Sequence, residues 1–253
     1  MAGRRPAVFL DYDGTLTPIV DRPQDAVISP SMKDTVRRLA TRCPVCVVTG
    51  RDRALVEEWM GVAGLVVAGS HGFDIADQRT GAPVLPDESL VGFEPLLAAI
   101  TERLRGELAA IPGAVVEPKR FSVAVHYRLV PEPARPAVTA VVQAVLSDHP
   151  GQLRLTPGKM VYEIQPKINW HKGRAVQYLR RVLHADGPEF VSLYLGDDIT
   201  DEDAFTAVTA HGAGIGIIVA DLSDPAQATR RTAADFVLHS VEEVEQFLNS
   251  LAR

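Results

Sequence analysis

Several features that mark particular classes of protein are scarce in this chain of 253 residues. It has two cysteines, aromatic residues make up 6%, and no apolar run approaches the ~20 residues of a membrane-spanning helix. The apolar run nearest the start, at 7–10, ends at Asp11 and is too short for a signal peptide. We therefore expect no membrane association and a cytoplasmic location.

The two cysteines, Cys43 and Cys46, lie in a C-P-V-C stretch that leads into an apolar segment. Their spacing suits a redox pair. Two thiols in or beside a buried strand, kept reduced in a cytoplasm, are the simpler interpretation.

An excess of positive charge is also missing. The formal net charge is -6 and the pI is near 5.7, which argues against nucleic acid or an anionic membrane as the main partner. The hydrophobic share of 46% with 23% charged residues is ordinary for a globular protein, so a buried core is expected. The length suits one domain with a large insertion, or two modest domains.

Short apolar runs alternate with helix-period segments in both end regions of the chain. This pattern predicts an α/β fold, with a parallel sheet covered by helices on both faces. We predict strands at 7–11, 45–49, 65–69, 190–196, 214–219 and 235–238. We predict helices at 31–42, 52–60, 172–183, 201–209 and 240–251.

The middle of the chain has a different period. Residues 121–128 alternate strictly, with Phe121, Val123, Val125 and Tyr127 on one face, as in an antiparallel sheet with one open face. Similar strands at 115–118, 153–157 and 160–165 accompany helices at 92–108 and 132–148. We therefore predict that 89–166 form an α+β domain inserted into a core domain made of 1–88 and 167–253.

The first chemically suggestive stretch is D-Y-D-G-T, which follows the strand at 7–11. Asp11 and Asp13 are two positions apart, so both fall on one face at the carboxyl end of a parallel strand, where ligands of open α/β sheets bind. Gly14 allows the chain to turn away sharply. By itself, an Asp-Gly turn after a strand explains the stretch equally well.

Two further stretches offer groups that bind anions. Thr49 and Gly50 follow a buried strand at the start of a helix, where a hydroxyl and backbone N–H groups face a positive helix terminus. Considered alone, Thr49 is better explained as a helix N-cap. Lys172 stands near a helix start, which costs roughly 0.3 to 1 kcal/mol unless an anion is bound there.

The fourth stretch, 196–203, carries five carboxylates in seven residues. Thr200 and Asp203 fit a capping pair, and an acidic first turn of a helix accounts for Asp201 and Glu202. Asp197 and Asp198 remain as adjacent carboxylates at a strand end. A hard cation with oxygen ligands is the simplest way to offset their repulsion.

The motifs DYDGT, VVTGR, HKG and GDDITDED occur in this order, and in this the sequence strongly resembles the haloacid dehalogenase superfamily. The resemblance implies a Rossmann-like core with an inserted cap. It also implies that Asp11 attacks phosphorus to form an aspartyl-phosphate, while Asp13 protonates the leaving oxygen and then activates water. Mg²⁺ would bind Asp11, the backbone carbonyl of Asp13, and Asp197.

The same resemblance assigns the remaining core residues. Thr49, the N–H of Gly50 and Lys172 would hold the phosphoryl oxygens. Asp198 and Asp201 would orient the metal-binding groups and not bind the metal themselves.

Charged residues of the inserted unit concern the substrate. Glu117 and Lys119 share one strand face by parity, as do Lys159 and Glu163. Such charges suit a polyhydroxylated ligand, because carboxylates accept from sugar hydroxyls and lysines donate to them. From the residues alone, two surface ion pairs worth about 0 to 1 kcal/mol each are the preferred explanation.

The chain also resembles the trehalose 6-phosphate phosphatase family over almost its whole length. The shared segments are AGSHG at 68–72, VEPKRFSVAVHYR at 116–128, GKMVYEI at 158–164 and YLGDDITDEDAF at 194–205. The resemblance implies that Glu117, Lys119, Lys159 and Glu163 hold the distal glucose of trehalose 6-phosphate, with Arg128 near the sugar or the phosphate. The inserted unit would be a mobile cap, and a separate trehalose-phosphate synthase would be a partner.

Other functions stay open from the sequence. The substrate could be another disaccharide or pseudo-disaccharide phosphate, which the cap charges do not distinguish from trehalose 6-phosphate. A non-catalytic sugar-phosphate sensor is disfavoured because it needs no nucleophile at Asp11. A sugar phosphomutase would return the phosphoryl group to sugar instead of water.

Overall fold

The computed structural model describes residues 3–76, 83–84, 90, 92–158, 160–210 and 214–253. The chain divides into two compact units. The core unit comprises Met1–Pro86 and Trp170–Arg253, and the inserted unit comprises Asp87–Asn169. The sequence places these boundaries after residues 88 and 166.

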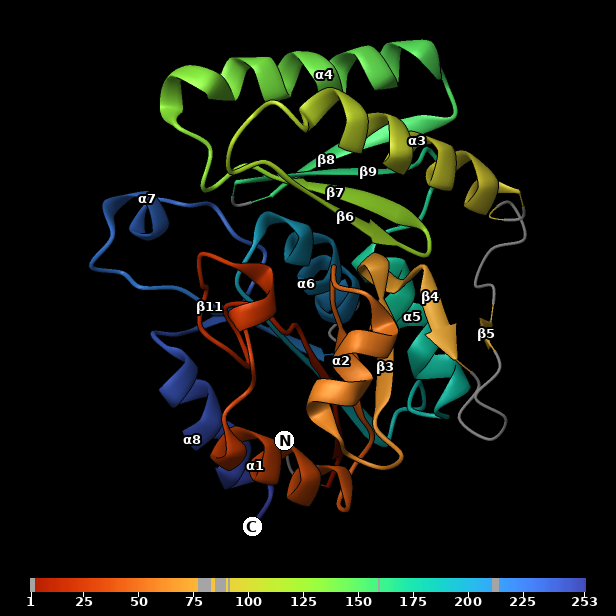
Figure 1. The fold of residues 1–253 in the computed structure, drawn as a ribbon. Helices are drawn as coiled ribbons and strands as arrows, with labels where there is room; N and C mark the ends of the chain where they lie inside the picture. The colour runs from red at the N-terminus through yellow and green to blue at the C-terminus, as the bar shows by residue number, and fades with distance from the viewer. Residues whose placement is uncertain (1–2, 77–82, 85–89, 91, 159, 211–213) are drawn as a thin grey trace. The chain divides into compact units, whose positions relative to one another are not determined.

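An eight-stranded sheet forms the centre of the core unit, in the order β12-β11-β10-β1-β2-β3-β4-β5 (Figure 1). The pairs from β12 to β3 are parallel, which confirms the predicted α/β fold with a parallel sheet. The parallel strands are β1 (Arg5–Leu10), β2 (Val45–Val48), β3 (Val66–Gly69), β10 (Phe190–Gly196), β11 (Gly214–Val219) and β12 (Phe236–Leu238). Two short antiparallel strands at one edge, β4 (Asp74–Ala76) and β5 (Pro83–Val84), were not predicted.

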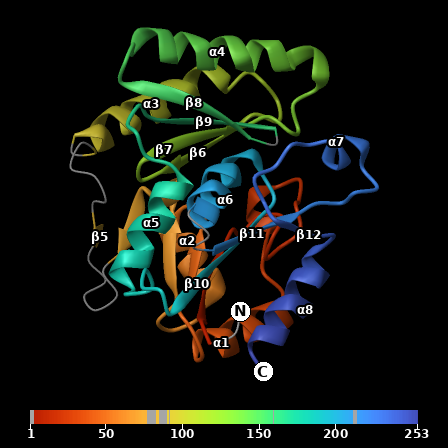
Figure 2. The same cartoon turned by 180° about the vertical axis from the view of Figure 1, so that it is seen from behind.

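Helices cover both faces of this sheet (Figure 2). The helices α1 (Pro30–Ala40), α2 (Arg53–Met60) and α8 (Val241–Leu251) bury apolar side chains in one cluster with alternate strand residues such as Val8 and Leu10. The helices α5 (Lys172–Val182) and α6 (Glu202–Thr209) pack against each other, and Phe205 of α6 contacts the ring of Tyr194. A short helix α7 (Pro225–Ala228) and the 3₁₀ turns η1 (Pro23–Asp25), η2 (Ser70–Gly72) and η5 (Ile199–Asp201) complete the unit.

The inserted unit has two layers. Its antiparallel sheet has the order β6-β7-β9-β8, with β6 (Val115–Lys119), β7 (Ser122–His126), β8 (Leu153–Gly158) and β9 (Val161–Pro166). The helices α3 (Phe93–Leu108) and α4 (Arg135–Asp148) cover one face of it, and a 3₁₀ turn, η4 (Glu132–Ala134), precedes α4 (Figures 1 and 2). Val123, Val125 and Ile164 point into the core beneath these helices, so the opposite face carries the intervening polar residues.

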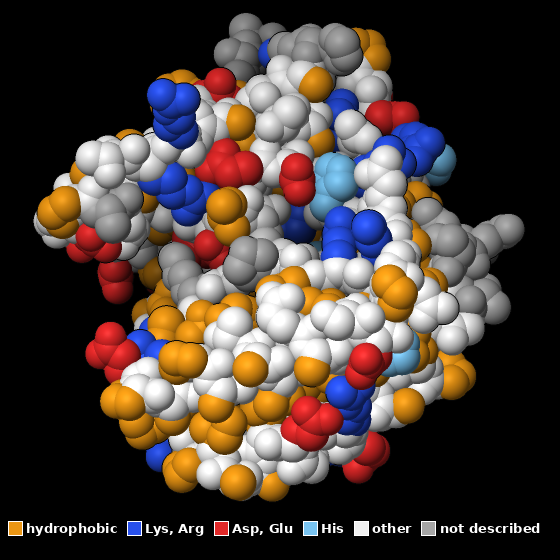
Figure 3. Space-filling view, turned by 90° about the horizontal axis from the view of Figure 1, so that it is seen from above, with side chains coloured by type: hydrophobic (Ala, Val, Ile, Leu, Met, Phe, Trp, Pro, Cys, Tyr) orange, Lys and Arg blue, Asp and Glu red, His pale blue; other side chains and the backbone are white. Residues whose placement is uncertain are grey.

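The charge on the described surface and the state of both cysteines match what the composition predicts. On the face shown in Figure 3, acidic and basic side chains are interspersed and neither sign covers a broad area. No helix in the described ranges is both long and apolar enough to cross a membrane. Both cysteines are free thiols, and burial raises the pKa of Cys43 to about 11, which disfavours the reactive thiolate.

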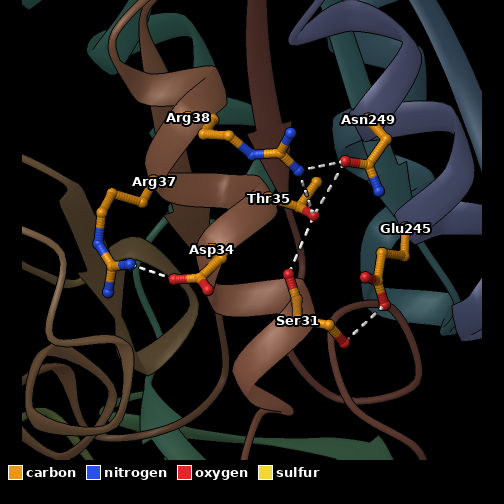
Figure 4. A pocket seen from close by; sticks show the side chains of 7 residues that line it. All are labelled: Ser31, Asp34, Thr35, Arg37, Arg38, Glu245 and Asn249. Atoms are coloured by element: carbon orange, nitrogen blue, oxygen red, sulfur yellow. Dashed lines mark hydrogen bonds and ion pairs between the residues drawn. The ribbon is translucent and has the colours of Figure 1, made fainter.

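A pocket on the core unit lies between α1 and α8 (Figure 4). Its polar side chains bond to one another: Thr35 Oγ1 donates to Asn249 Oδ1 at 3.2 Å, and Ser31 donates to Glu245 at 3.3 Å. Arg38 also donates to Asn249. These bonds join the first and last α-helices of the described chain, so we assign this pocket a structural role.

Gly72 offers a test of the packing between η2 and α5. Its φ is +89°, and a Cβ atom there would lie 2.2 Å from the Cβ of Ala175. Left-handed backbone and overpacking together predict that Gly72→Ala lowers the free energy of unfolding by roughly 2 to 4 kcal/mol. Urea unfolding followed by circular dichroism measures this loss.

Gly106 is the matched control, because it is exposed within α3 and a Cβ there meets nothing within 4 Å. Gly106→Ala should stabilise its unit by roughly 0.5 to 1 kcal/mol. Equal effects of the two substitutions would contradict the packing described for Gly72.

Candidate active site

Three neighbouring strands deliver the first residues of the site. The strands β10, β1 and β2 are adjacent and parallel, and Asp197, Asp11 and Thr49 directly follow their carboxyl ends. The N–H of Asp11 donates to the carbonyl of Leu195 at 2.8 Å, which ties the end of β1 to β10. The chain order runs in opposite directions on the two sides of β1, and this switch point is where open α/β sheets bind ligands.

A buried lysine pairs with two of the aspartates. Lys172 is the first residue of α5 and 3% exposed, and its Nζ donates to Asp11 Oδ1 at 2.7 Å and to Asp201 Oδ1 at 2.8 Å. Burial by itself would lower the pKa of Lys172, but the carboxylates of Asp11 and Asp201 outweigh it and raise that pKa. The anions that the sequence reasoning required at this helix start are therefore present in the protein itself.

The pKa of Asp11 is raised well above its usual value. Burial is the largest cause, and the negative charges of Asp201 and Asp197 add to it, while Lys172 opposes them. The carboxylate of Asp11 thus lies buried beside two further carboxylates and one ammonium group.

Asp201 has every oxygen engaged. Its Oδ1 accepts from Lys172 and, at 2.6 Å, from the hydroxyl of Tyr194. Its Oδ2 accepts from the N–H groups of Asp197 at 3.0 Å and Asp198 at 2.9 Å. A carboxylate with four donors is held firmly in place, and the orienting role expected of Asp201 from the sequence stays a prediction.

Tyr194 is a residue that the sequence reasoning missed. It is fully buried in β10, and burial and the charge of Asp201 raise the pKa of its phenol. A signal was available, because a tyrosine inside an otherwise apolar buried strand needs a hydrogen-bond partner.

Asp11, Asp197 and Asp201 form a buried acidic cluster, with one oxygen of each within 4.8 Å of the others. The carboxylate of Asp197 lies against Gly14, where a Cβ atom would be 2.2 Å from Asp197 Oδ2. Glycine at position 14 therefore allows the loop of Asp197 to approach closely, and it also allows the left-handed turn at φ +76°. Three converging carboxylates are ligands that suit a hard divalent cation.

The capping pair expected at Thr200 and Asp203 is wrong. Asp198 caps η5 by accepting from the N–H of Ile199 at 2.7 Å, and Asp201 completes the capping box. The cap lies at Asp198, two residues before the expected Thr200, because the 3₁₀ turn η5 precedes α6. Asp198 thus bonds to backbone, outside the acidic cluster.

Arg230 is a second residue that the sequence did not indicate. Its guanidinium donates to the carbonyl of Asp197 at 2.8 Å and to Glu202 Oε1 at 2.8 Å. Glu202 Oε2 in turn accepts from the N–H of Ala233 at 2.8 Å. Arg230 therefore fastens the segment after α7 to the loop that carries Asp197, and Glu202 fastens the same segment to the start of α6, which is more than the first-turn acid expected from sequence.

Thr49 and Gly50, two of the residues expected to bind an anion, directly follow β2. Thr49 is buried, and its Oγ1 accepts from the N–H of Arg51 at 3.1 Å, while Asp52 and not Thr49 caps α2. The imidazole of His71 lies beside Gly50, where a Cβ atom would be 2.9 Å from the ring. His71 has φ +58° between two further left-handed residues, a backbone strain that is typical of functional sites.

Asp13 does not join the acidic cluster. Its carboxylate forms a two-point ion pair with Arg51, with Nε to Oδ2 at 2.7 Å and Nη2 to Oδ1 at 2.6 Å. The second aspartate of the DYDGT motif is therefore turned toward a cation that follows Thr49 and Gly50.

In the inserted unit, Glu117 and Lys119 bond to partners on other strands, whereas the sequence grouped Glu117 with Lys119 on one strand. Lys119 Nζ lies 2.9 Å from Glu163 Oε2, and Ser122 donates to Glu163 Oε1 at 2.5 Å. Glu117 Oε2 is 2.6 Å from His126 Nε2. These side chains share one face of β6, β7 and β9, and half-buried Arg128 follows β7. Lys159 lies outside the described residues.

The buried pair of Lys172 with Asp11 and Asp201 predicts a pH-dependent loss of stability. Lys172→Met would leave two buried carboxylates without their cation, a change that costs about 3 to 5 kcal/mol. Asp11 has a folded-state pKa above its unfolded value, so its contribution to stability is lost as pH rises through that raised pKa. The destabilisation by Lys172→Met should therefore be larger at pH 8 than at pH 5.

Urea unfolding in the presence of a chelator measures this. Arg174→Met is the matched control, since Arg174 is exposed in the first turn of the same helix. A Lys172→Met loss no larger than that of the control, or one that does not depend on pH, would contradict the buried ion pair.

The trehalose-phosphatase family model matches residues 9–241. A trehalose-phosphate phosphatase of Mycobacterium tuberculosis is 40% identical over 254 residues, which cover 100% of this chain and 63% of that protein. The chain thus spans less than two thirds of this relative's length.

Two solved structures show the fold. A trehalose-6-phosphate phosphatase related protein has a TM-score of 0.81 at 23% identity, covering 97% of this chain and 96% of that one. A haloacid dehalogenase-like hydrolase from Bacteroides thetaiotaomicron has a TM-score of 0.64 at 14% identity, covering 98% and 99%. The predicted family and fold are both confirmed: the chain belongs to the trehalose-phosphatase family and has the fold of haloacid dehalogenase-like hydrolases.

Proposed function

We propose that this protein is a magnesium-dependent phosphatase that hydrolyses trehalose 6-phosphate to trehalose and phosphate through an aspartyl-phosphate on Asp11. The observation that carries the proposal is the buried carboxylate of Asp11 at the end of β1, held by Lys172 and next to Asp197. The family membership and the name of the mycobacterial relative support the substrate.

In the proposed reaction, a carboxylate oxygen of Asp11 attacks phosphorus and the bond from phosphorus to the sugar oxygen breaks. Asp13 gives a proton to that leaving oxygen and then takes one from the water that hydrolyses the aspartyl-phosphate. Thr49, the N–H of Gly50 and Lys172 bind the phosphoryl oxygens and keep the group aligned for attack.

The acidic cluster fits a magnesium ion. We assign the ligands as Asp11, the backbone carbonyl of Asp13, and Asp197, because Asp201 already accepts four hydrogen bonds. When bound, the ion offsets the repulsion between the attacking carboxylate and the phosphoryl group. Asp198 and Asp201 orient the loop, and Arg230 holds the carbonyl of Asp197.

We propose that the polar face of the inserted unit binds the distal glucose. Glu117, Lys119 and Glu163 lie on one face of its sheet, and Lys159 and Arg128 complete the proposed set. The bond of Lys119 to Glu163 also fits a purely structural ion pair, so the contribution of these residues to selectivity needs a direct test. A separate trehalose-phosphate synthase as partner stays a prediction.

The proposal is tested by phosphate release from a panel of sugar phosphates, with and without a chelator. Faster turnover of another disaccharide or pseudo-disaccharide phosphate would show that this compound, and not trehalose 6-phosphate, is the preferred substrate. Trapping with beryllium fluoride, which mimics the aspartyl-phosphate, separates the phosphatase from a sugar-phosphate sensor. Unchanged trapping in Asp11→Asn would refute the proposed nucleophile.

Magnesium should stabilise the folded protein, and more so at higher pH. A ligand at 100 times its dissociation constant adds about 2.7 kcal/mol to the free energy of unfolding. Because the pKa of Asp11 is raised, protonation of Asp11 competes with the metal at low pH. The melting temperature should therefore rise on adding Mg²⁺, with a larger shift at pH 8 than at pH 5.

Asp197→Asn is the variant that should lose most of this shift. Asp221→Asn is its control, since Asp221 is an exposed acid that bonds to Ser223. An equal magnesium shift in both variants would exclude the proposed ligand set.

Glu163 tests the role of the inserted unit. Glu163→Gln should lower kcat/KM for trehalose 6-phosphate by roughly tenfold or more, because a hydrogen bond to a charged group is worth about 1.5 to 3 kcal/mol. A small aryl phosphate has no second sugar, so its kcat/KM should change less than about twofold. The control is Glu102→Gln, in which an exposed acid of α3 is replaced. Equal losses on both substrates would contradict selective recognition.

A further inference from the structure

We propose that Arg51 is a positioning residue that holds the carboxyl group of Asp13 and so controls the proton transfers of the reaction. The inference rests on the proposed role of Asp13 as the general acid and base. It assigns to Arg51 a function that the motif VVTGR does not reveal from sequence.

The contact between the two side chains fixes the plane of the carboxyl group. Arg51 Nε donates to Asp13 Oδ2 at 2.7 Å and Arg51 Nη2 donates to Asp13 Oδ1 at 2.6 Å. A planar guanidinium that engages both oxygens leaves the carboxylate little freedom to rotate. The contact therefore holds the carboxyl group of Asp13 in one orientation, which a residue that gives and takes protons at a fixed position requires.

Arg51 is itself held by aromatic rings. It is 9% exposed, and its Cζ lies 5.1 Å from the ring centre of Trp59 and 5.8 Å from that of Tyr12. These rings stack with centres 5.9 Å apart, and the hydroxyl of Tyr12 donates to the carbonyl of Ala26 at 3.0 Å. The rings fix the guanidinium, since cations are attracted to aromatic faces. Tyr12 lies between Asp11 and Asp13, which gives this buried tyrosine a role in the site.

The backbone of Arg51 belongs to the proposed phosphate cradle. Its N–H donates to Thr49 Oγ1 at 3.1 Å, and its carbonyl accepts from the N–H of Ser70 at 2.8 Å. One residue thus has its main chain beside Thr49 and Gly50 and its side chain on Asp13. The turn that carries Thr49 and Gly50 therefore also fixes the position from which Arg51 reaches Asp13.

A simple structural ion pair is the competing explanation. Asp13 is 33% exposed at its side chain, and a partly exposed pair of this kind contributes about 0 to 1 kcal/mol to stability. In that case, loss of Arg51 would change the melting temperature and leave the kinetic role of Asp13 intact.

The experiment is a double-mutant cycle with Arg51→Met, Asp13→Asn and the double variant, in full-length protein with magnesium present. We expect Arg51→Met to lower kcat by roughly tenfold, a fraction of the 10²–10⁴ that a general acid or base supplies, with KM changed less than about threefold. In the Asp13→Asn background, the same substitution should change kcat less than twofold, because Arg51 acts through Asp13. Arg51→Lys should recover part of the activity, since it keeps the charge but loses the two-point contact.

An equal fold-loss of kcat in both backgrounds would overturn the proposal. A loss confined to KM would also overturn it, because it would show that Arg51 contacts the phosphate directly. If Arg51→Met does not fold, Arg51→Lys and its double variant give the same comparison.

A small aryl phosphate serves as a second substrate for the cycle. Hydrolysis of the aspartyl-phosphate needs Asp13 as base whichever alcohol has left, so the coupling can be measured on it. Failure of the wild type on trehalose 6-phosphate would then count against the proposed function, and lack of coupling on the aryl phosphate would count against the role of Arg51.

Discussion

The site depends on the ion pairs that the buried ammonium group of Lys172 makes with two aspartates. This group lies between Asp11 and Asp201, so three carboxylates and one ammonium group meet at the ends of β1 and β10. Burying a charge is costly unless it is paired and hydrogen-bonded, so these groups stay in place only as a set. The first turn of α5 is consequently fixed relative to the end of β1, although Lys172 and Asp11 are 161 residues apart.

The close approach of the loops has a steric condition as well as an electrostatic one. Gly14 leaves room for the carboxylate of Asp197, and Gly50 leaves room for the ring of His71. In each case, the glycine of one motif accommodates a side chain of another. The glycines of DYDGT and VVTGR are therefore explained by contacts between motifs, in addition to turns within them.

Much of the fold could be predicted from the sequence because its signal is local. Apolar runs that end in polar residues identify buried parallel strands, and the six parallel strands of the core were all expected. The strands β4 and β5 were not, since two or three residues carry no periodic signal and their pairing depends on the edge strand β3. The cap was misassigned for a related reason, because several acids in a row could each act as cap and only the three-dimensional turn makes Asp198 the cap of η5.

The candidate site divides in the same way. Asp11, Asp197, Lys172 and Thr49 could be proposed because each follows a strand or begins a helix, and sheet topology brings such ends together. The contacts of Tyr194 with Asp201, of Arg230 with Asp197 and of Arg51 with Asp13 were not predicted. Nothing in the spacing along the chain encodes which acid an arginine will reach, so these contacts emerge only from the folded structure.

The aspartates of this site have the same side chain and differ only in their neighbours. Asp201 accepts four hydrogen bonds and is thereby restricted to holding the loop. Asp13 has both oxygens on Arg51, and Asp198 bonds to backbone as a cap. Asp11 accepts from Lys172 on one oxygen, and burial raises its pKa, with Asp201 and Asp197 adding to the effect. A cation bound at this cluster favours the ionised form of Asp11. The division of labour among chemically identical residues is therefore set by the number and charge of the donors that each one meets.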